Sequence, residues 1–195
     1  MPPALVLIGP AGTGKSTVGA AVAAALDVPF WDADEHGEQF YAEQGWTLDR
    51  LRDRITTVGR LAAEYEWEPA RAHAVTALVD AADGGVLALG AGHTTYTQAA
   101  HRATVQAALA TAPHVVMLLP HKDADLGLPV LRERCRADKG TEWVRDGHDF
   151  LAQWWADPHP RRWATDLVIT GDEGPAATAE RVLALVDPAR PGRRA

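Results

Sequence analysis

The chain has 195 residues, of which 47% are hydrophobic and 23% are charged. This composition is typical of a globular domain and argues against a disordered chain. A formal net charge of -7 argues against a general nucleic-acid binder, which needs a basic face. Cys135 is the only cysteine, so neither an internal disulfide nor a cysteine-based zinc site can form. No apolar run reaches the roughly 18 residues of a membrane-spanning helix, and no signal peptide is evident, so we expect a cytoplasmic protein.

Short apolar runs alternate with helical patterns along the chain. Strands are predicted at residues 4–8, 28–31, 86–89, 115–119 and 167–170, and helices at 15–26, 36–43, 48–57, 60–82, 97–110, 130–136, 150–155 and 176–186. Pro69 is expected to kink or restart the long helix, and residues 137–147 are expected to be mobile. This alternation predicts an α/β domain of three layers with a parallel sheet. We expect one domain over residues 1–187 and a frayed tail over 188–195.

A glycine-rich segment follows the first predicted strand. Residues 9–16, GPAGTGKS, match the pattern G-x-x-x-x-G-K-[ST] without a gap. Glycines let the backbone curl so that N–H groups face phosphate oxygens, and the following helix adds partial positive charge at its N-terminus. Lys15 is expected to reach the outer phosphates, and the Ser16 hydroxyl to bind Mg²⁺. The predicted nucleotide-binding residues here are Gly9, Gly12, Thr13, Gly14, Lys15, Ser16 and Thr17. The alternative is a glycine-rich turn that matches by chance.

Two acidic residues, Asp32 and Asp34, follow the second predicted strand. The fourth strand ends at Pro120 and offers no carboxylate for a metal. Because ligands collect at the carboxyl ends of parallel strands, we expect one aspartate to support Mg²⁺ through water. The other would accept a proton from a substrate hydroxyl. The alternative is that this pair only caps the helix that starts near His36.

Three segments together carry a resemblance to a known family. They are the phosphate loop, residues 28–34 (VPFWDAD), and the turn Gly90-Ala91-Gly92 after the third strand. In this combination they resemble the shikimate kinase family. Residues 131–136 are similar to the family's helix before its lid, and residues 166–172 are similar to its last strand.

The resemblance implies a fold and a reaction. The fold would be a P-loop kinase with a five-stranded parallel sheet in the order 2-3-1-4-5. A helical substrate-binding region would span about residues 35–75, and a lid about residues 137–150. The enzyme would transfer the γ-phosphate of ATP, with Mg²⁺, to a hydroxyl group of a small molecule. Catalysis would rest on positioning, charge neutralisation and lid closure.

The resemblance also implies roles for single residues at the nucleotide end. Lys15 would bind the β- and γ-phosphates, and Ser16 and Asp32 would hold Mg²⁺. Arg134 would stack on the adenine ring. A solvated helix face is the alternative for this arginine.

At the acceptor end, the resemblance makes Asp34 the candidate base. Lys139 or Arg145 would supply a lid cation that neutralises the transferring phosphoryl group, and Arg145 is placed with the catalytic residues. The predicted substrate-binding residues are Asp34, Glu64, Trp67, Gly90, Gly92 and His93. His93 would bind a hydroxyl or assist proton transfer, or would only stabilise its turn.

The departures from the family concern the acceptor. The family's Phe-Arg-x-x-Glu segment, whose arginine binds a substrate carboxylate, corresponds to residues 59–68 and lacks that arginine. The family has a second carboxylate-binding arginine before its last strand, and the matching position in this chain lies near the acidic Asp157. The acids that could line the pocket instead are Glu64, Glu66, Glu68 and Asp157. A buried acid beside a carboxylate is costly, so we expect a neutral or amine-bearing acceptor. Arg60 or Arg71 could instead replace the lost cation, which keeps shikimate itself open.

Other functions remain as alternatives. Gluconate kinases share the phosphate loop, and residues 32–36 and 134–140 are faintly similar to theirs. A nucleoside monophosphate kinase needs arginines aimed at an acceptor phosphate, and those at residues 50–60 lie among many acids. A non-catalytic nucleotide-binding module, either an ATPase or a switch, is the alternative of another class. A switch that binds GTP would need an Asn-Lys-x-Asp motif, which is absent. We expect a monomer or homodimer that binds neither nucleic acid nor membrane.

The chain has seven tryptophans. Trp46 and Trp67 lie in the expected substrate region and Trp143 in the lid, where they could stack on a ligand. The later ones, Trp154, Trp155 and Trp163, are expected to pack against the core. Cys135 is expected to be an inert buried or helix-face residue.

Overall fold

The computed structural model describes residues 1–187; the predicted tail at 188–195 lies outside them. Five parallel strands form one sheet in the order β2-β3-β1-β4-β7. They are β1 Leu5–Ile8, β2 Phe30–Asp32, β3 Val86–Ala88, β4 Val115–Leu119 and β7 Asp166–Ile169. Since β7 is the fifth strand of this sheet along the chain, the expected order 2-3-1-4-5 is confirmed.

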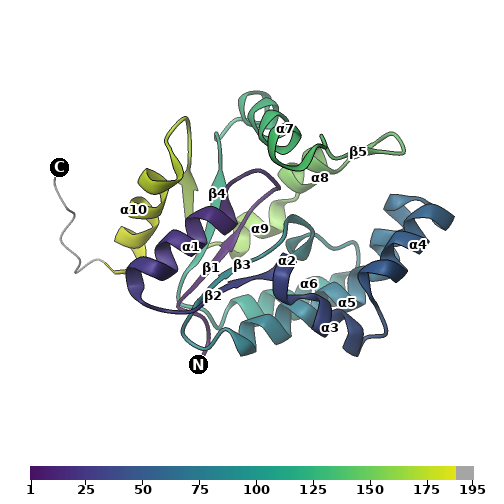
Figure 1. Cartoon of the computed structure of the whole chain (residues 1–195), viewed down its shortest axis with the longest axis horizontal. Helices are drawn as coiled ribbons and strands as arrows, with labels where there is room; N and C mark the ends of the chain where they lie inside the picture. Colours follow the sequence, from purple (N-terminus) through teal and green to yellow (C-terminus); the bar gives the residue numbers. More distant parts are fainter. Residues whose placement is uncertain (188–195) are drawn as a thin grey trace.

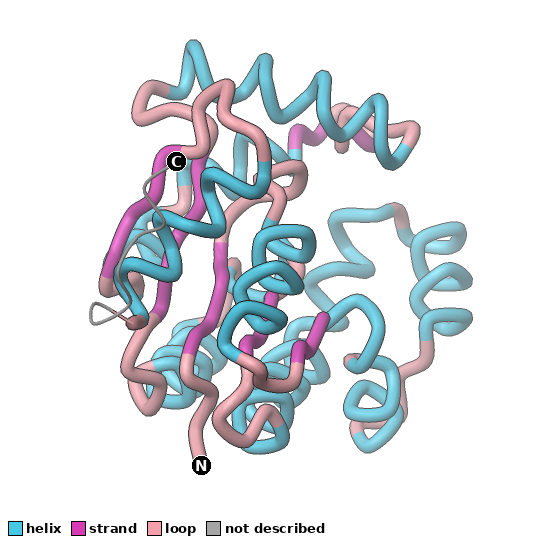
Figure 2. The backbone as a smooth tube through the Cα atoms, turned by 60° about the vertical axis from the view of Figure 1, so that its left-hand side comes forward, coloured by secondary structure: helices cyan, strands magenta, loops and turns pink. Residues whose placement is uncertain are grey.

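Helices cover both faces of the sheet (Figures 1 and 2). Side chains of β1 alternate between the faces. Leu5 and Leu7 belong to the core formed with α1 (Lys15–Leu26) and α10 (Pro175–Val186), and Val6 and Ile8 to the core formed with α5 (Arg60–Ala81) and α6 (Ala99–Leu109). The result is the three-layer α/β architecture that the sequence predicts.

The segment between β2 and β3 is helical. It contains α2 (Ala33–His36), α3 (Glu38–Glu43), α4 (Leu48–Val58) and α5. Tyr41, Trp46 and Trp67 are buried there in a separate small core. Helix α5 runs without a break through Pro69, so the predicted restart at that position is wrong. Pro69 is exposed, so the carbonyl that loses its hydrogen bond lies on the solvent side.

The segment after β4 is more structured than its sequence suggests. Helix α7 (Ala124–Lys139) starts earlier than predicted, because Asp123 caps it. The expected mobile segment contains a small hairpin of β5 (Val144–Arg145) and β6 (His148–Asp149), which leads into α8 (Phe150–Ala156). Helix α9 (Pro158–Trp163) was not predicted, because Pro158 and Pro160 were interpreted as the end of the preceding helix. Pro158 instead stands at the first position of α9, where proline is favoured. Within residues 1–187, no helix is both long and apolar enough to cross a membrane.

Candidate functional site

The glycine-rich loop lies between β1 and α1. Gly9 and Gly12 have φ values of 138° and 79°, which residues other than glycine rarely adopt. A Cβ at Gly12 would also lie 2.9 Å from Cys135 Sγ. Among the described residues no side chain caps α1, and the first N–H groups of a helix have no partner within it. The loop therefore presents a ready site for an anion.

Lys15 is buried at the start of α1. Its Nζ donates hydrogen bonds of 2.9 Å to the carbonyl oxygens of Gly9 and Pro10. Burial lowers the pKa of Lys15 to about 8, and the nearby carboxylate of Asp34 opposes this shift. The ammonium group is thus held on its own loop, at the place where phosphates would arrive.

Asp32 and Asp34 lie at the end of β2, beside the phosphate loop. The buried Asp32 accepts a hydrogen bond of 2.9 Å from the Asp34 N–H and so caps α2. The Asp34 side chain is largely exposed, and its carboxylate lies 3.9 Å from Lys139 Nζ. Both aspartates line the cavity described below. Asp32 therefore caps α2 and lines the cavity at the same time.

One cavity of about 320 Å³ joins the phosphate loop to the helical region. The predicted site residues that line it are Gly12, Gly14, Lys15, Ser16, Thr17, Asp32, Asp34, Glu64, Trp67, Gly90, Gly92 and His93. We call it the acceptor cavity. Lys139, Trp143 and Trp154 also line it, although Trp154 was expected only to pack the core.

Four predicted residues lie elsewhere. Thr13 and Arg134 line an adjoining cavity of about 260 Å³ on the other side of the loop, where Arg134 donates to the Gly171 carbonyl oxygen at 2.9 Å. Gly9 lines neither cavity but accepts the Lys15 hydrogen bond. Arg145 is exposed on the hairpin and donates to Thr141 Oγ1 at 2.9 Å. The structure therefore brings Lys139, and not Arg145, to the acceptor cavity.

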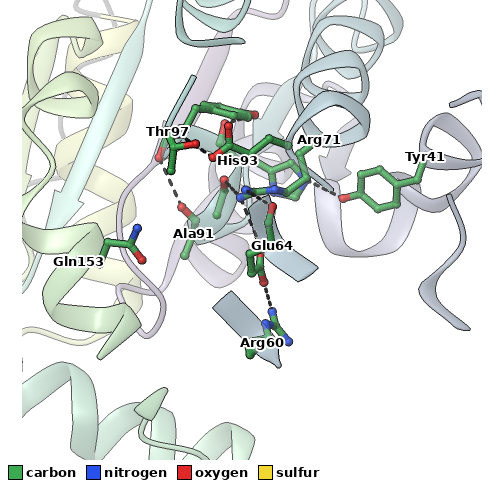
Figure 3. Close-up of polar contacts among 12 residues, drawn as sticks. Tyr41, Arg60, Glu64, Arg71, Ala91, His93, Thr97 and Gln153 are labelled. Carbon is green, nitrogen blue, oxygen red and sulfur yellow. Dashed lines mark hydrogen bonds and ion pairs between the residues drawn. The ribbon is translucent and has the colours of Figure 1, made fainter. Parts of the chain in front are cut away.

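A cluster of two arginines and one glutamate closes the far end of the acceptor cavity. Glu64 forms an ion pair with Arg60 and lies 3.6 Å from Arg71 Nη1. Arg71 is 4% exposed and also donates to the carbonyl oxygens of Gly92 and Glu64. Within residues 1–187, the buried Nε atoms of both arginines have no hydrogen-bond partner. Figure 3 shows Glu64 between the two arginines, so two cations share one carboxylate.

The other acids expected in this pocket do not line it. Glu66 accepts hydrogen bonds of 2.7 and 2.6 Å from Arg54 of α4. Glu68 is buried and accepts hydrogen bonds from the Thr97 and Gln98 N–H groups. Asp157 caps α9. The expectation of a neutral or amine-bearing acceptor rested on four carboxylates, and of these only Glu64 lines the cavity. Arg60 and Arg71 both line it.

His93 is buried in the turn after β3. Its Nε2 lies 2.6 Å from the Tyr41 hydroxyl, an interaction that the sequence did not predict. Burial lowers the pKa of His93 to about 4, so the ring is neutral at physiological pH. A Cβ at Gly90 would lie 2.6 Å from His93 Nδ1 and 2.8 Å from Asp34 Oδ1. Only glycine at position 90 therefore lets these two side chains face each other.

Within the described chain, no group of three or more His, Cys, Asp or Glu side chains could hold a metal ion by itself. This donor set still suits Mg²⁺ bound with a nucleotide, because Mg²⁺ commonly takes one or two protein ligands and completes its shell with phosphates and water. Ser16 and Asp32 line the same cavity and offer such ligands.

Comparisons with known proteins agree with this arrangement. A family model described as shikimate kinase matches residues 11–119. The shikimate kinase of Pseudomonas syringae pv. syringae is 32% identical over 179 residues, which cover 88% of each chain. The solved shikimate kinase from Acinetobacter baumannii, in complex with shikimate, has a TM-score of 0.69 at 22% identity, covering 97% of this chain and 95% of that one. A gluconokinase from Sinorhizobium meliloti has a TM-score of 0.56 at 18% identity, covering 96% and 93%.

The structural likenesses establish the fold, and the sequence matches establish the family. The family model spans more than half of the chain, and the Pseudomonas relative is aligned over most of it. The chain therefore belongs to the shikimate kinase family and is an ATP-dependent kinase that phosphorylates a hydroxyl group of a small molecule.

Proposed function

We propose that this kinase phosphorylates a carboxylate-bearing acceptor and that shikimate is the first compound to test. The observation that carries the proposal is the cluster at the acceptor end, in which Arg60 and Arg71 share the single carboxylate of Glu64. The buried Nε of Arg60 has no partner among the described residues. A carboxylate on the acceptor would compensate the remaining charge through charge-assisted hydrogen bonds. Relatives named shikimate kinase support this choice.

At the nucleotide end, the loop N–H groups and Lys15 would hold the phosphates. Arg134 would contact the base in the adjoining cavity, which it lines together with Thr17. Ser16 and Asp32 would hold Mg²⁺. The bound ion supplies neutralisation of the negative charge on the phosphates.

At the acceptor end, Asp34 would accept the proton of the attacking hydroxyl. The acceptor oxygen forms a bond to the γ-phosphorus while the bond from that phosphorus to the oxygen bridging the β- and γ-phosphates breaks, and ADP leaves. Lys139, 3.9 Å from Asp34 in this structure, would neutralise the phosphoryl group in transit. The neutral ring of His93 would orient the acceptor, with the hydroxyl of Tyr41 fixing the ring in turn.

A neutral or amine-bearing acceptor is the second candidate. The observation in its favour is that Glu64 contacts both arginines, and Asp34 adds a second carboxylate near the same end of the cavity. Each arginine then already shares a carboxylate, which leaves less need for an anionic acceptor. An amine on the acceptor would pair with Glu64.

Acceptor-dependent ADP release tests the choice between these candidates. Shikimate, gluconate, amino alcohols, hydroxy amino acids and aminocyclitols would be compared with Mg-ATP. For a carboxylate acceptor, we expect Arg60→Met to raise KM by about 10- to 100-fold with little change in kcat, because one charge-assisted contact to a bound carboxylate is lost. Arg54→Met is the matched control, since Arg54 pairs with Glu66 outside the cavity. Unchanged KM in Arg60→Met, or turnover of amines alone, would contradict the proposal.

The lid cation is tested by a second pair of variants. We expect Lys139→Met to lower kcat by about 10- to 1000-fold, since it removes a charge aimed at the transferring group. Arg145→Met should stay within about threefold of the unchanged enzyme, because Arg145 lies outside the acceptor cavity. Steady-state kinetics at saturating Mg-ATP measures both. The reverse order of effects would make Arg145 the lid cation, which is the other residue that the resemblance leaves open.

The lowered pKa of Lys15, about 8, predicts proton uptake on nucleotide binding. Phosphate oxygens favour the charged ammonium and raise its pKa on binding. At pH 8, about half a proton per Mg-ADP should be taken up, and almost none at pH 6.5, where Lys15 is already charged. Calorimetric titrations in Tris and in HEPES, which differ in ionisation enthalpy, measure this number. Lys139→Met should keep the uptake; equal uptake at both pH values would refute the assignment to Lys15.

A further inference from the structure

The hairpin of β5 and β6 has a tight turn at its tip. Arg145 pairs with His148, so the turn itself consists of Asp146 and Gly147. Their φ values are 52° and 75°, and two residues with positive φ form the type I′ turn that Asp-Gly favours. Figure 1 shows the hairpin, labelled β5, on the same side of the molecule as α4. Local geometry therefore accounts for the turn and leaves the Asp146 carboxylate available for a contact outside the hairpin.

The Asp146 carboxylate caps helix α5 from outside that helix. Arg60 is the first residue of α5, and its N–H donates to Asp146 Oδ2 at 3.0 Å, across 86 positions of the chain. The N-cap residue is Gly59, which has no side chain to accept this hydrogen bond. A Cβ at Gly59 would lie 3.2 Å from Asp146 Oδ2, so glycine leaves room for the carboxylate. Since the first N–H groups of a helix need an outside acceptor and attract negative charge, the hairpin supplies what α5 lacks.

The Arg60 side chain contacts the same part of the chain. Its guanidinium carbon lies 5.7 Å from the centroid of the Trp143 ring and 5.9 Å from that of the Phe150 ring. Both residues adjoin the hairpin in sequence, and both distances are within the range of cation–π interactions. The guanidinium also pairs with Glu64 and lines the acceptor cavity. The backbone and the side chain of Arg60 are thus both held by the hairpin and the residues next to it.

We propose that Asp146 is a positioning residue: by capping α5 from the hairpin, it holds Arg60 at its place in the acceptor cavity. Asp146 does not line that cavity, so it reaches the acceptor only through Arg60. A helix whose first N–H group loses its acceptor is destabilised at that end, and Arg60 is the residue that would move. The contact itself needs no ligand, whereas its effect on a carboxylate acceptor rests on the proposed function.

Two variants at the tip of the hairpin separate the cap from the turn. Asp146→Gly removes the carboxylate and keeps the turn, because Gly-Gly also favours type I′. Asp146→Asn keeps both, since asparagine suits the same turn and caps a helix about as well as aspartate does. Asp27→Gly is the matched control for loss of charge. Asp27 is also exposed and has a positive φ of 57°, but it lies at the end of α1.

Hydrogen exchange in the free protein tests the contact without a substrate. Proton–nitrogen NMR measures how fast the Arg60 backbone N–H and the buried Nε–H exchange with water, and Arg60→Met identifies the Nε–H signal by its loss. We expect both groups to exchange about threefold faster or more in Asp146→Gly, and at the original rate in Asp146→Asn and Asp27→Gly. An unchanged backbone rate in Asp146→Gly would overturn the cap, and an unchanged Nε–H rate would overturn the positioning of Arg60.

Kinetics with shikimate and Mg-ATP tests the effect on the acceptor. Asp146→Gly should raise KM for shikimate by about three- to tenfold, the usual effect of a lost helix cap, and leave kcat and KM for ATP unchanged. Asp146→Asn should restore the original KM. In an Arg60→Met background, Asp146→Gly should change KM no further, since it acts through Arg60. Effects that multiply in the double variant, or an unchanged KM in Asp146→Gly alone, would contradict the proposal.

The two sets of measurements fail separately. If the unchanged protein does not phosphorylate shikimate, the proposed function is wrong, and the exchange rates of Arg60 still decide whether Asp146 positions it. If shikimate is phosphorylated and the exchange rates are unaltered in Asp146→Gly, the proposed function stands and the role of Asp146 fails.

Discussion

The ion cluster of Arg60, Glu64 and Arg71 is the interaction on which the acceptor end depends. Arg71 is buried, and a buried charge must be paired; Glu64 pairs with Arg71 and with the partly exposed Arg60. Arg71 also donates to the Gly92 carbonyl oxygen, which ties α5 to the turn after β3. A Cβ at Gly92 would lie 2.7 Å from Arg71 Nη1, so the turn is shaped to receive this arginine.

The parallel sheet supplies the rest of the site. β1, β2 and β3 are neighbours and end at the same edge. The phosphate loop, the two aspartates and the turn from Gly90 to His93 follow directly from these ends. Lys139 is the last residue of α7 and reaches toward Asp34 across that edge. Phosphoryl transfer needs this kind of positioning and charge neutralisation more than it needs covalent chemistry by the protein.

Local sequence signals predicted the parts of this structure that local physics decides. The phosphate loop follows from glycine spacing, and α1 and β4 follow from apolar periodicity with their observed bounds. The capping by Asp32 was foreseen as an alternative to a metal role, and the structure makes the two compatible. Family resemblance supplied the strand order, which composition and periodicity could not.

Tertiary contacts decided the rest. Glu68 is one turn after Glu64 on α5, so spacing alone places both on one face. The Glu68 carboxylate instead accepts hydrogen bonds from backbone N–H groups of the loop before α6. Arg71 reaches the site only because α5 continues through Pro69. The sequence left Lys139 and Arg145 open as the lid cation, with Arg145 placed among the catalytic residues. No sequence signal marks the short hairpin that holds Arg145 outside the acceptor cavity.

The central claim is that the arginine cluster receives a carboxylate of the acceptor. It is tested most directly by comparing kcat/KM for shikimate and for its methyl ester, which keeps the hydroxyl groups and lacks the charge. We predict that the free acid is preferred by about 100-fold, as expected for loss of a charge-assisted, bidentate contact. An ester that is phosphorylated as efficiently as the acid would contradict the account and would favour the neutral acceptor.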